Sequence, residues 1–136
     1  MTTHVSPAGV AARTPATILI VEDDPGTVAV FGEILQRNGY DVCVAPDAES
    51  GLREVERVKP SAVLLDLRLP LADGVEFLRQ LRADAPQARM PIAVVTGDYF
   101  LEETVGREIQ ALGARVHFKP LWEEDLLKLV RELLDG

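Results

Sequence analysis

Short apolar runs alternate with longer segments of helical spacing along most of this chain, and no other feature restricts its fold as strongly. The runs are four or five residues long and rich in Val, Ile and Leu, as the strands of a buried parallel sheet are. They cover residues 17–21, 40–44, 62–65, 92–95 and 115–118. The alternation predicts an α/β fold in which helices cover both faces of a parallel sheet.

Apolar residues in the five segments that follow these runs recur at the spacing of amphipathic helices. The five stripes are Val28, Phe31, Ile34 and Leu35; Ala48, Leu52 and Val55; Val75, Leu78 and Leu81; Leu101, Val105, Ile109 and Leu112; and Leu126, Leu129, Val130 and Leu133. Asp24 is a candidate N-cap of the first helix, and Asp73 with Glu76 forms a candidate capping box for the third. Gly39 and Gly113 stand where the first and fourth helices are expected to end.

The length of the chain fits one domain with a substantial core. A domain of 136 residues buries roughly two-thirds of its unfolded surface. Residues 1–16 are mainly small residues, Thr and Pro without a continuous apolar core, so we expect a disordered tail and no signal peptide. Residues 17–136 then form the single domain, and its fifth helix leaves no room for a second.

The charge balance limits the partners of the chain. Its 14 basic and 22 acidic residues give a net charge of −8, which repels both nucleic acid and an anionic membrane surface. Its longest apolar runs are far below the roughly 20 residues that span a bilayer. Cys43 is the only cysteine, so we expect a buried reduced thiol. These features predict a cytoplasmic protein without direct nucleic-acid or membrane binding.

Polar side chains follow four of the predicted strands. Glu22, Asp23 and Asp24 follow the first strand, Asp66 the third, Thr96 and Gly97 end the fourth, and Lys119 follows the fifth. Ligands of open parallel sheets bind beyond the carboxyl ends of the strands, so these groups are expected to converge. Carboxylates held close together repel one another unless a pKa rises or a hard cation binds. The sequence therefore predicts a Mg²⁺ site at this edge.

Phosphoryl transfer is the chemistry that such a group of side chains suits best. Asp66 is the expected nucleophile, Asp23 the metal ligand, and Lys119 a second positive centre for the phosphoryl oxygens. Thr96 can donate a hydrogen bond to a phosphoryl oxygen once the group is attached. Asp24 is read primarily as a helix cap. Asp66 directly follows four apolar residues, where a charge without partners is costly, which favours a functional role.

Four motifs in order closely resemble the receiver domains of two-component response regulators. They are ILIVEDDP at residues 18–25, LLDLRLP at 64–70 followed by Gly74, VTG at 95–97, and FKP at 118–120. The resemblance covers residues 17–134. It implies a flavodoxin-like, doubly wound (βα)5 fold with strand order 2-1-3-4-5, as in the chemotaxis receiver.

The resemblance also implies roles for individual residues. Asp66 is the phosphoacceptor, Asp23 a direct ligand of Mg²⁺ or Mn²⁺, and Glu22 a ligand through water. The backbone carbonyl of Arg68 completes the protein ligands. The bond between Lys119 and Pro120 is expected to be cis, which aims the lysine inward.

The partners implied by the resemblance are all proteins. A sensor histidine kinase or phosphotransfer protein supplies the phosphoryl group from a phosphohistidine, and a downstream protein partner receives the signal. The only catalysis implied is self-directed phosphotransfer and autodephosphorylation, with no separate substrate. The face of the fourth helix, fifth strand and fifth helix is the candidate surface for a homodimer.

The chain departs from the family pattern at the switch. Val116 stands where the family places a Tyr or Phe, so a different route from phosphate to partner is expected, through Thr96, Gly97 and the loop with Tyr99 and Phe100. Tyr99 and Phe100 either contact a partner or pack against the fourth helix. Trp122 is either an exposed anchor or part of the core. His117 is expected at the surface of an edge strand.

Other functions remain open at this point. A receiver-shaped interaction module that does not use phosphorylation is the main alternative, and the chain can also be the N-terminal fragment of a longer regulator or hybrid kinase. A haloacid-dehalogenase-like phosphatase would need an acid at Arg68. A flavin carrier would need a phosphate loop where Glu22, Asp23 and Asp24 stand, and these carboxylates would repel phosphate. The sequence names neither the kinase nor the pathway.

Overall fold

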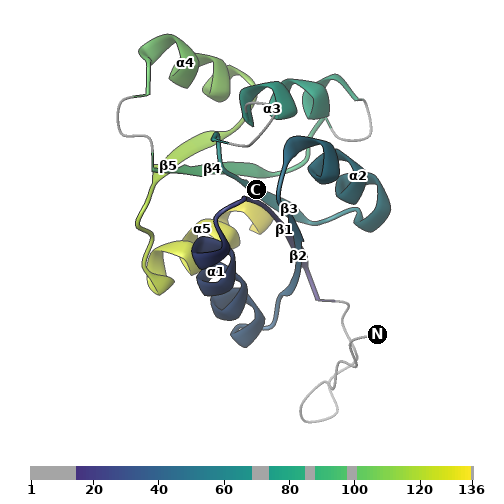
Figure 1. The fold of residues 1–136 in the computed structure, drawn as a ribbon, viewed down its shortest axis with the longest axis vertical. Helices are drawn as coiled ribbons and strands as arrows, with labels where there is room; N and C mark the ends of the chain where they lie inside the picture. Colours follow the sequence, from purple (N-terminus) through teal and green to yellow (C-terminus); the bar gives the residue numbers. More distant parts are fainter. Residues whose placement is uncertain (1–14, 69–73, 85–87, 98–100, 136) are drawn as a thin grey trace.

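Five strands form one parallel sheet in the order β2-β1-β3-β4-β5. Their bounds are Thr17–Val21 for β1, Asp41–Ala45 for β2, Ala62–Leu65 for β3, Ile92–Thr96 for β4 and Arg115–Phe118 for β5. The computed structural model describes residues 15–68, 74–84, 88–97 and 101–135. The order confirms the predicted doubly wound, flavodoxin-like α/β fold (Figure 1).

Two strands differ slightly from their predicted bounds. β2 begins and ends one residue later than expected, because the Tyr40 N–H donates to the Leu35 carbonyl at 3.1 Å and so belongs to the turn that ends the first helix. β4 extends through Thr96, which pairs with Phe118 of β5. The other three strands have the predicted bounds.

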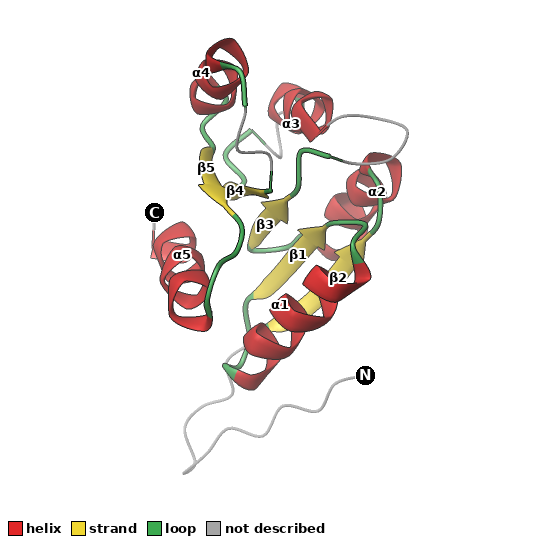
Figure 2. Ribbon diagram, turned by 60° about the vertical axis from the view of Figure 1, so that its left-hand side comes forward, coloured by secondary structure: helices red, strands yellow, loops and turns green. Residues whose placement is uncertain are grey.

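Five helices cover the two faces of the sheet. They are α1 (Pro25–Arg37), α2 (Ala48–Val58), α3 (Gly74–Ala83), α4 (Glu103–Ala111) and α5 (Glu123–Asp135). Helices α1 and α5 lie on one face, and α2, α3 and α4 on the other (Figure 2). Among the described residues, none of these helices has the length and hydropathy needed to cross a bilayer.

The helix ends follow the expected chemistry. The Asp24 carboxylate accepts from the Thr27 N–H at 2.9 Å and caps α1. Gly39 and Gly113 follow α1 and α4 with φ of 89° and 79°, left-handed values that favour glycine. The candidate capping box at Asp73 falls outside the described residues, as does the predicted tail except for residues 15 and 16.

Alternate residues of the central strands enter two separate cores. Leu19, Val63 and Val94 face α2, α3 and α4, whereas Ile20 and Leu64 face α1 and α5. All five side chains are almost completely buried. Because both faces of the sheet are apolar, the charged residues that follow the strands gather at its carboxyl edge.

Candidate functional site

Three carboxylates meet at the carboxyl edge of the sheet. Glu22, Asp23 and Asp66 each offer an oxygen atom, and these atoms lie within 4.8 Å of one another. The Asp66 N–H donates to the Val21 carbonyl at 3.0 Å. Because β1 and β3 are neighbouring strands with Val21 opposite Leu65, the residues that follow them are placed side by side. The structure thus brings Asp66 beside Glu22 and Asp23, which stand far earlier in the sequence.

The carboxylates differ in their exposure. Glu22 is 4% exposed and Asp66 is 7% exposed, whereas Asp23 is open to solvent. A buried carboxylate needs compensating partners. Asp23 lies at the entrance of the cluster, where an arriving cation or phosphoryl group meets it first.

Lys119 supplies the compensating charge. Its Nζ lies 2.5 Å from Oε1 of Glu22 and 3.3 Å from Oδ2 of Asp66. Its backbone N–H donates to the Thr96 carbonyl at 2.9 Å, which ties the lysine to the end of β4. The bond between Lys119 and Pro120 is cis, as the resemblance implied. The ammonium group therefore joins the two buried carboxylates.

Burial and neighbouring charges shift the pKa values of this ion pair. Burial of Glu22 and its hydrogen bond with Asp66 raise its pKa to about 7, although Lys119 acts in the opposite direction. Burial alone would lower the pKa of Lys119, but the hydrogen bond with Glu22 and the charge of Asp66 outweigh it and raise the pKa. Lys119 is therefore positively charged at neutral pH.

Backbone groups orient the Asp66 carboxylate. Its Oδ1 accepts from the Arg68 N–H at 3.1 Å, while Oδ2 faces Lys119. Further along the chain, the Gly74 N–H donates to the Leu67 carbonyl at 2.9 Å. A Cβ on Gly74 would lie only 2.7 Å from the Asp66 carbonyl oxygen. Gly74 therefore permits a close approach that fixes the backbone around Asp66, a function its motif did not reveal.

Thr96 lies at the carboxyl end of β4 and is fully buried, followed by exposed Gly97. The Thr96 side chain is thus covered in this structure. Val116 is half-buried and packs against the core beneath α2, α3 and α4. Tyr99 and Phe100 lie outside the described residues.

The structure tests the predictions for three further side chains. Trp122 is 70% exposed just before α5, so the core interpretation is wrong, and its role as an anchor stays a prediction. His117 does lie on the edge strand β5, but the prediction of a surface residue is wrong. Its side chain is half-buried, and its Nε2 is covered, with no hydrogen-bond partner among the described residues. Cys43 is also only half-buried, and its thiol donates to Glu54 at 2.9 Å.

The carboxylate cluster fits a small hard cation. Glu22, Asp23 and Asp66 offer oxygen ligands, which Mg²⁺ and Mn²⁺ prefer, and a bound cation would relieve the repulsion among them. The cation would share the cluster with Lys119, which already contacts two of the three carboxylates. The donor set is therefore suitable for a metal that also binds phosphate.

Sequence comparisons relate the chain to known regulators. A family model described as the response regulator receiver domain matches residues 18–131. The chain is 33% identical over 123 residues to Protein PilH of Pseudomonas aeruginosa, covering 89% of this chain and 99% of that protein. It is 37% identical over 95 residues to the alkaline phosphatase synthesis transcriptional regulatory protein PhoP of Bacillus subtilis, covering 69% and 39%. Response regulator MprA of Mycolicibacterium vanbaalenii is 34% identical over 123 residues, covering 88% and 51%. The chain thus spans about half or less of PhoP and MprA.

Solved structures agree with this relationship. A CheY-like response regulator receiver domain protein from Methanospirillum hungatei superposes with a TM-score of 0.82 at 30% identity, covering 90% of this chain and 95% of that one. The receiver domain of sensor histidine kinase PA1611 from Pseudomonas aeruginosa, solved with magnesium coordinated in its active site cleft, gives 0.80 at 27% identity, covering 90% and 100%. The match of the family model over most of the chain, together with these relatives, shows that the chain belongs to the response regulator receiver domain family.

Proposed function

We propose that the chain is a phosphoacceptor of a two-component phosphorelay, in which Asp66 receives a phosphoryl group from a phosphohistidine of a sensor histidine kinase or phosphotransfer protein. The observation that carries this proposal is the setting of the Asp66 carboxylate. One oxygen accepts from the Arg68 N–H at 3.1 Å, the other lies 3.3 Å from the Lys119 ammonium, and Glu22 and Asp23 adjoin it. The Arg68 N–H and the Lys119 ammonium orient the Asp66 carboxylate, and the lysine places a positive charge beside the oxygen that would attack.

In the proposed step, a carboxylate oxygen of Asp66 attacks the phosphorus atom of the phosphohistidine. The P–O bond forms as the P–N bond breaks, and the imidazole leaves with the electron pair of that bond. Lys119 can turn from Glu22 toward the phosphoryl oxygens without losing contact with the site, because it already contacts both carboxylates. Its charge then stabilises the negative oxygens of the transition state.

We further propose that the carboxylate cluster holds Mg²⁺ or Mn²⁺. Asp23, Asp66 and the backbone carbonyl of Arg68 would bind it directly, and Glu22 through a water molecule. When bound, the cation neutralises charge on the phosphoryl oxygens. The magnesium ion reported for the similar PA1611 receiver domain supports this assignment. Asp23 is open to solvent, so water can reach the site from that side, and slow autodephosphorylation of Asp66 is the expected second self-directed activity.

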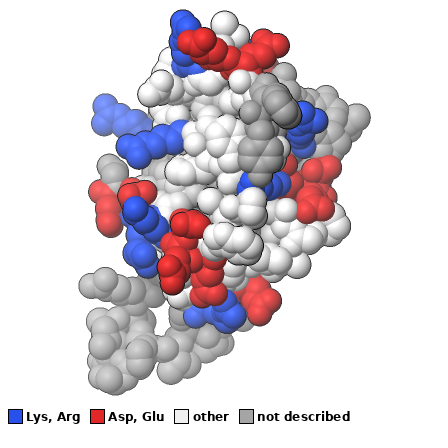
Figure 3. All heavy atoms as spheres, turned by 90° about the vertical axis from the view of Figure 1, so that its left-hand side faces the viewer, with Lys and Arg blue, Asp and Glu red and all other residues white. Residues whose placement is uncertain are grey.

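The proposed output is a contact with a downstream protein. The face of α4, β5 and α5 is the candidate surface for that partner or for a homodimer, and exposed Trp122 is its candidate anchor. Figure 3 views the molecule from this side and shows uncharged residues over much of its centre. The net charge of −8 argues against direct nucleic-acid binding and membrane binding. A cytoplasmic location is proposed, where such kinases present their phosphohistidine.

One experiment tests the phosphoacceptor proposal. The parent protein is incubated with Mg²⁺ and a small phosphoramidate donor, and its intact mass is measured. We expect a gain of one phosphoryl group, which Asp66→Asn and removal of Mg²⁺ with a chelator both abolish. Asp24→Asn is the matched control and should keep the gain, because Asp24 caps α1.

The second candidate is a receiver-shaped interaction module, which Val116 favours because the usual aromatic residue of the switch is missing. No mass gain in the folded parent protein, or an unchanged gain in Asp66→Asn, would support this alternative and contradict the phosphoacceptor proposal.

A further inference from the structure

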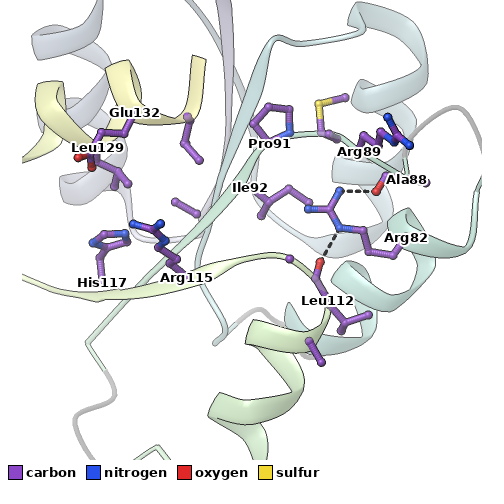
Figure 4. A pocket seen from close by; sticks show the side chains of 15 residues that line it. Arg82, Ala88, Arg89, Pro91, Ile92, Leu112, Arg115, His117, Leu129 and Glu132 are labelled. Carbon is purple, nitrogen blue, oxygen red and sulfur yellow. Dashed lines mark hydrogen bonds between the residues drawn. The ribbon is translucent and has the colours of Figure 1, made fainter. Parts of the chain in front are cut away.

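A pocket of about 610 Å³ opens at the amino edge of the sheet, opposite the carboxylate cluster. It lies beneath the first residues of β4 and β5, and the ends of α3, α4 and α5 complete it (Figure 4). Its apolar lining is formed mainly by Met90, Pro91, Ile92, Leu112, Leu129 and Leu133. This volume lies within the range of roughly 300–1,000 Å³ that is usual for small-molecule sites.

Basic side chains dominate the polar part of the lining. Arg82, Arg89, Arg115 and His117 line the pocket, and Glu132 is its one acidic residue. This local excess of basic groups occurs in a chain whose net charge is −8. Neither Arg89 nor Arg115 forms an ion pair with any residue in the described part of the chain. The two exposed guanidinium groups therefore leave positive charge at the mouth of an apolar pocket.

Arg82 builds the wall between α3 and α4. Its Nε donates to the Leu112 carbonyl at 2.7 Å and its Nη1 to the Ala88 carbonyl at 3.2 Å, as the dashed lines in Figure 4 show. Burial lowers the pKa of Arg82 from its usual value, although an arginine stays charged at neutral pH. These bonds fix the end of α4 against the segment before β4, which gives the pocket a defined wall.

His117 adds a polar atom without a partner. Its side chain lies on the α5 side of β5, near Arg115 and Glu132 (Figure 4). Its Nε2 is covered and accepts or donates no hydrogen bond to the described residues. Burial lowers the pKa of His117, and the charge of Arg115 acts in the same direction. A neutral ring that turns toward the pocket would give a bound ligand one hydrogen bond.

We propose that this pocket binds a small organic anion, with an apolar body against Leu129 and Leu133 and its anionic group in the positive field of Arg89 and Arg115, which border the pocket. An apolar lining with a few convergent polar groups is the usual composition of such a site. A guanidinium group suits a carboxylate, sulfonate or phosphate group as its partner. The site is separate from the phosphoacceptor, so its occupancy does not depend on the function of Asp66.

The probe for this proposal is anilinonaphthalene sulfonate, an aromatic anion that fluoresces when it leaves water. Titration of the folded parent protein should show saturable binding of one equivalent. Arg89→Gln and Arg115→Gln should each weaken binding by about threefold, as expected for partly exposed charge pairs. Glu132→Gln should tighten binding, because it removes the one repelling carboxylate. Arg131→Gln is the matched control: Arg131 is exposed on α5 but does not line the pocket, so affinity should not change.

A neutral analogue and three competitors complete the test. N-phenyl-naphthylamine, which lacks the sulfonate, should bind the parent and the Arg89→Gln and Arg115→Gln variants equally. Naphthoate and decanoate should both displace the sulfonate probe, and the tighter of the two shows whether the pocket prefers an aromatic or an aliphatic body. Inorganic phosphate alone should not displace the probe, because it cannot use the apolar lining. The proposal is overturned if the probe does not bind the parent, or if the two arginine variants bind it as tightly as the parent does. Loss of folding stability in these variants without loss of affinity would show that the arginines serve only the nearby helix ends.

Discussion

Gly74 illustrates how a residue without a side chain positions a reactive one. A Cβ at this position would lie 2.7 Å from both the Asp66 carbonyl oxygen and the Leu67 Cα. Gly74→Ala must therefore displace backbone, and we expect it to lower the free energy of unfolding by about 2 kcal/mol. It should also slow phosphorylation of Asp66. Urea denaturation and the mass assay measure the two effects.

Gly32 is the matched control for this substitution. It lies inside α1, and nothing lies within 4 Å of a Cβ built there. Gly32→Ala should raise the free energy of unfolding by about 0.5–1 kcal/mol, the usual advantage of alanine in a helix. Equal stability of the two variants would mean that the close approach at Gly74 has no energetic consequence.

His117 should make stability depend on pH. Burial lowers its pKa in the folded state below the usual 6.5. The folded state then binds fewer protons than the unfolded state, so the stability that neutral His117 contributes is present above pH 6.5 and is lost as the pH falls below it. Arg115 and Glu132 are the charged groups that act on the ring, and Arg115 adds to the effect while Glu132 opposes it.

The measurement is the difference in unfolding free energy between the parent and His117→Gln at pH 7.5 and pH 5.5. This difference should shrink at the lower pH, and comparison within each pH cancels the titration of the carboxylates. His4→Gln, the control for the other histidine, should leave the pH dependence of the parent unchanged. A difference that stays constant or grows at pH 5.5 would show that the pKa of His117 is not lowered.

At the scale of single residues, the sequence predicts which charged side chains converge better than it predicts which of them form each ion pair. Glu22, Asp66 and Lys119 were expected to converge because each follows a strand of one sheet. That Lys119 lies closer to Glu22 than to Asp66 depends on side-chain reach and on packing at the end of β5. The half-buried state of His117 was missed for a similar reason, since the burial of a side chain on an edge strand depends on how closely the neighbouring helix packs over it.

At the scale of elements, two adjacent carboxylates at the end of β1 have separable functions. Asp24 caps α1 through two bonds to Thr27, at 2.9 Å from its N–H and 2.7 Å from its hydroxyl. Asp23 belongs to the carboxylate cluster. We expect Asp24→Ala to lower the folding equilibrium constant by about fivefold, the usual effect of a lost N-cap, and to keep Mg²⁺ affinity.

Asp23→Ala should give the reverse result. Its removal relieves repulsion within the cluster, so stability without metal should not fall, while Mg²⁺ affinity should drop by at least tenfold. Urea denaturation in a chelator and calorimetric titration with Mg²⁺ give the two readouts. The assignment of Asp23 as a metal ligand fails if its variant binds Mg²⁺ as tightly as the parent does.

Element type was predictable because the apolar period changes clearly between strands and helices, but element ends depend on local hydrogen bonds. Tyr40 reads as a strand residue by composition, yet its N–H completes the turn after α1. The capping box of α2 was also missed. Its Asp47 carboxylate accepts from the Ser50 N–H at 2.8 Å, with a serine in place of the usual Glu or Gln.

At the scale of the whole molecule, the two ends of the sheet differ in how well the sequence predicted them. The carboxyl edge collects residues that directly follow strands, so topology alone places them. The pocket at the amino edge collects side chains from α3, β4, β5 and α5. No sequence motif links the residues that line this pocket. Only the packing of the elements shows that Arg89 and Arg115 border one cavity.

The connection from Asp66 to the surface gives the last prediction. Lys119 joins β5 to the segment before α5, where the Trp122 carbonyl accepts from the Leu126 N–H at 2.9 Å. When Lys119 turns from Glu22 to a phosphoryl group, residues 119–122 should shift with it, because the stretch is short and Leu126 is fixed in the core. Trp122 is the only tryptophan of the chain, so tryptophan fluorescence reports the surroundings of this one side chain.

We therefore expect phosphorylation with Mg²⁺ and a phosphoramidate to change the intensity or emission maximum of Trp122, and Asp66→Asn to show no change. Trp122→Phe should lose the signal yet keep the mass gain of one phosphoryl group, which separates reporting from chemistry. A parent protein that gains the phosphoryl mass while its emission stays constant would contradict a route through Lys119 and α5. Because Val116 lacks the aromatic ring of the usual switch, that result would direct the search to Thr96 and the segment that follows β4.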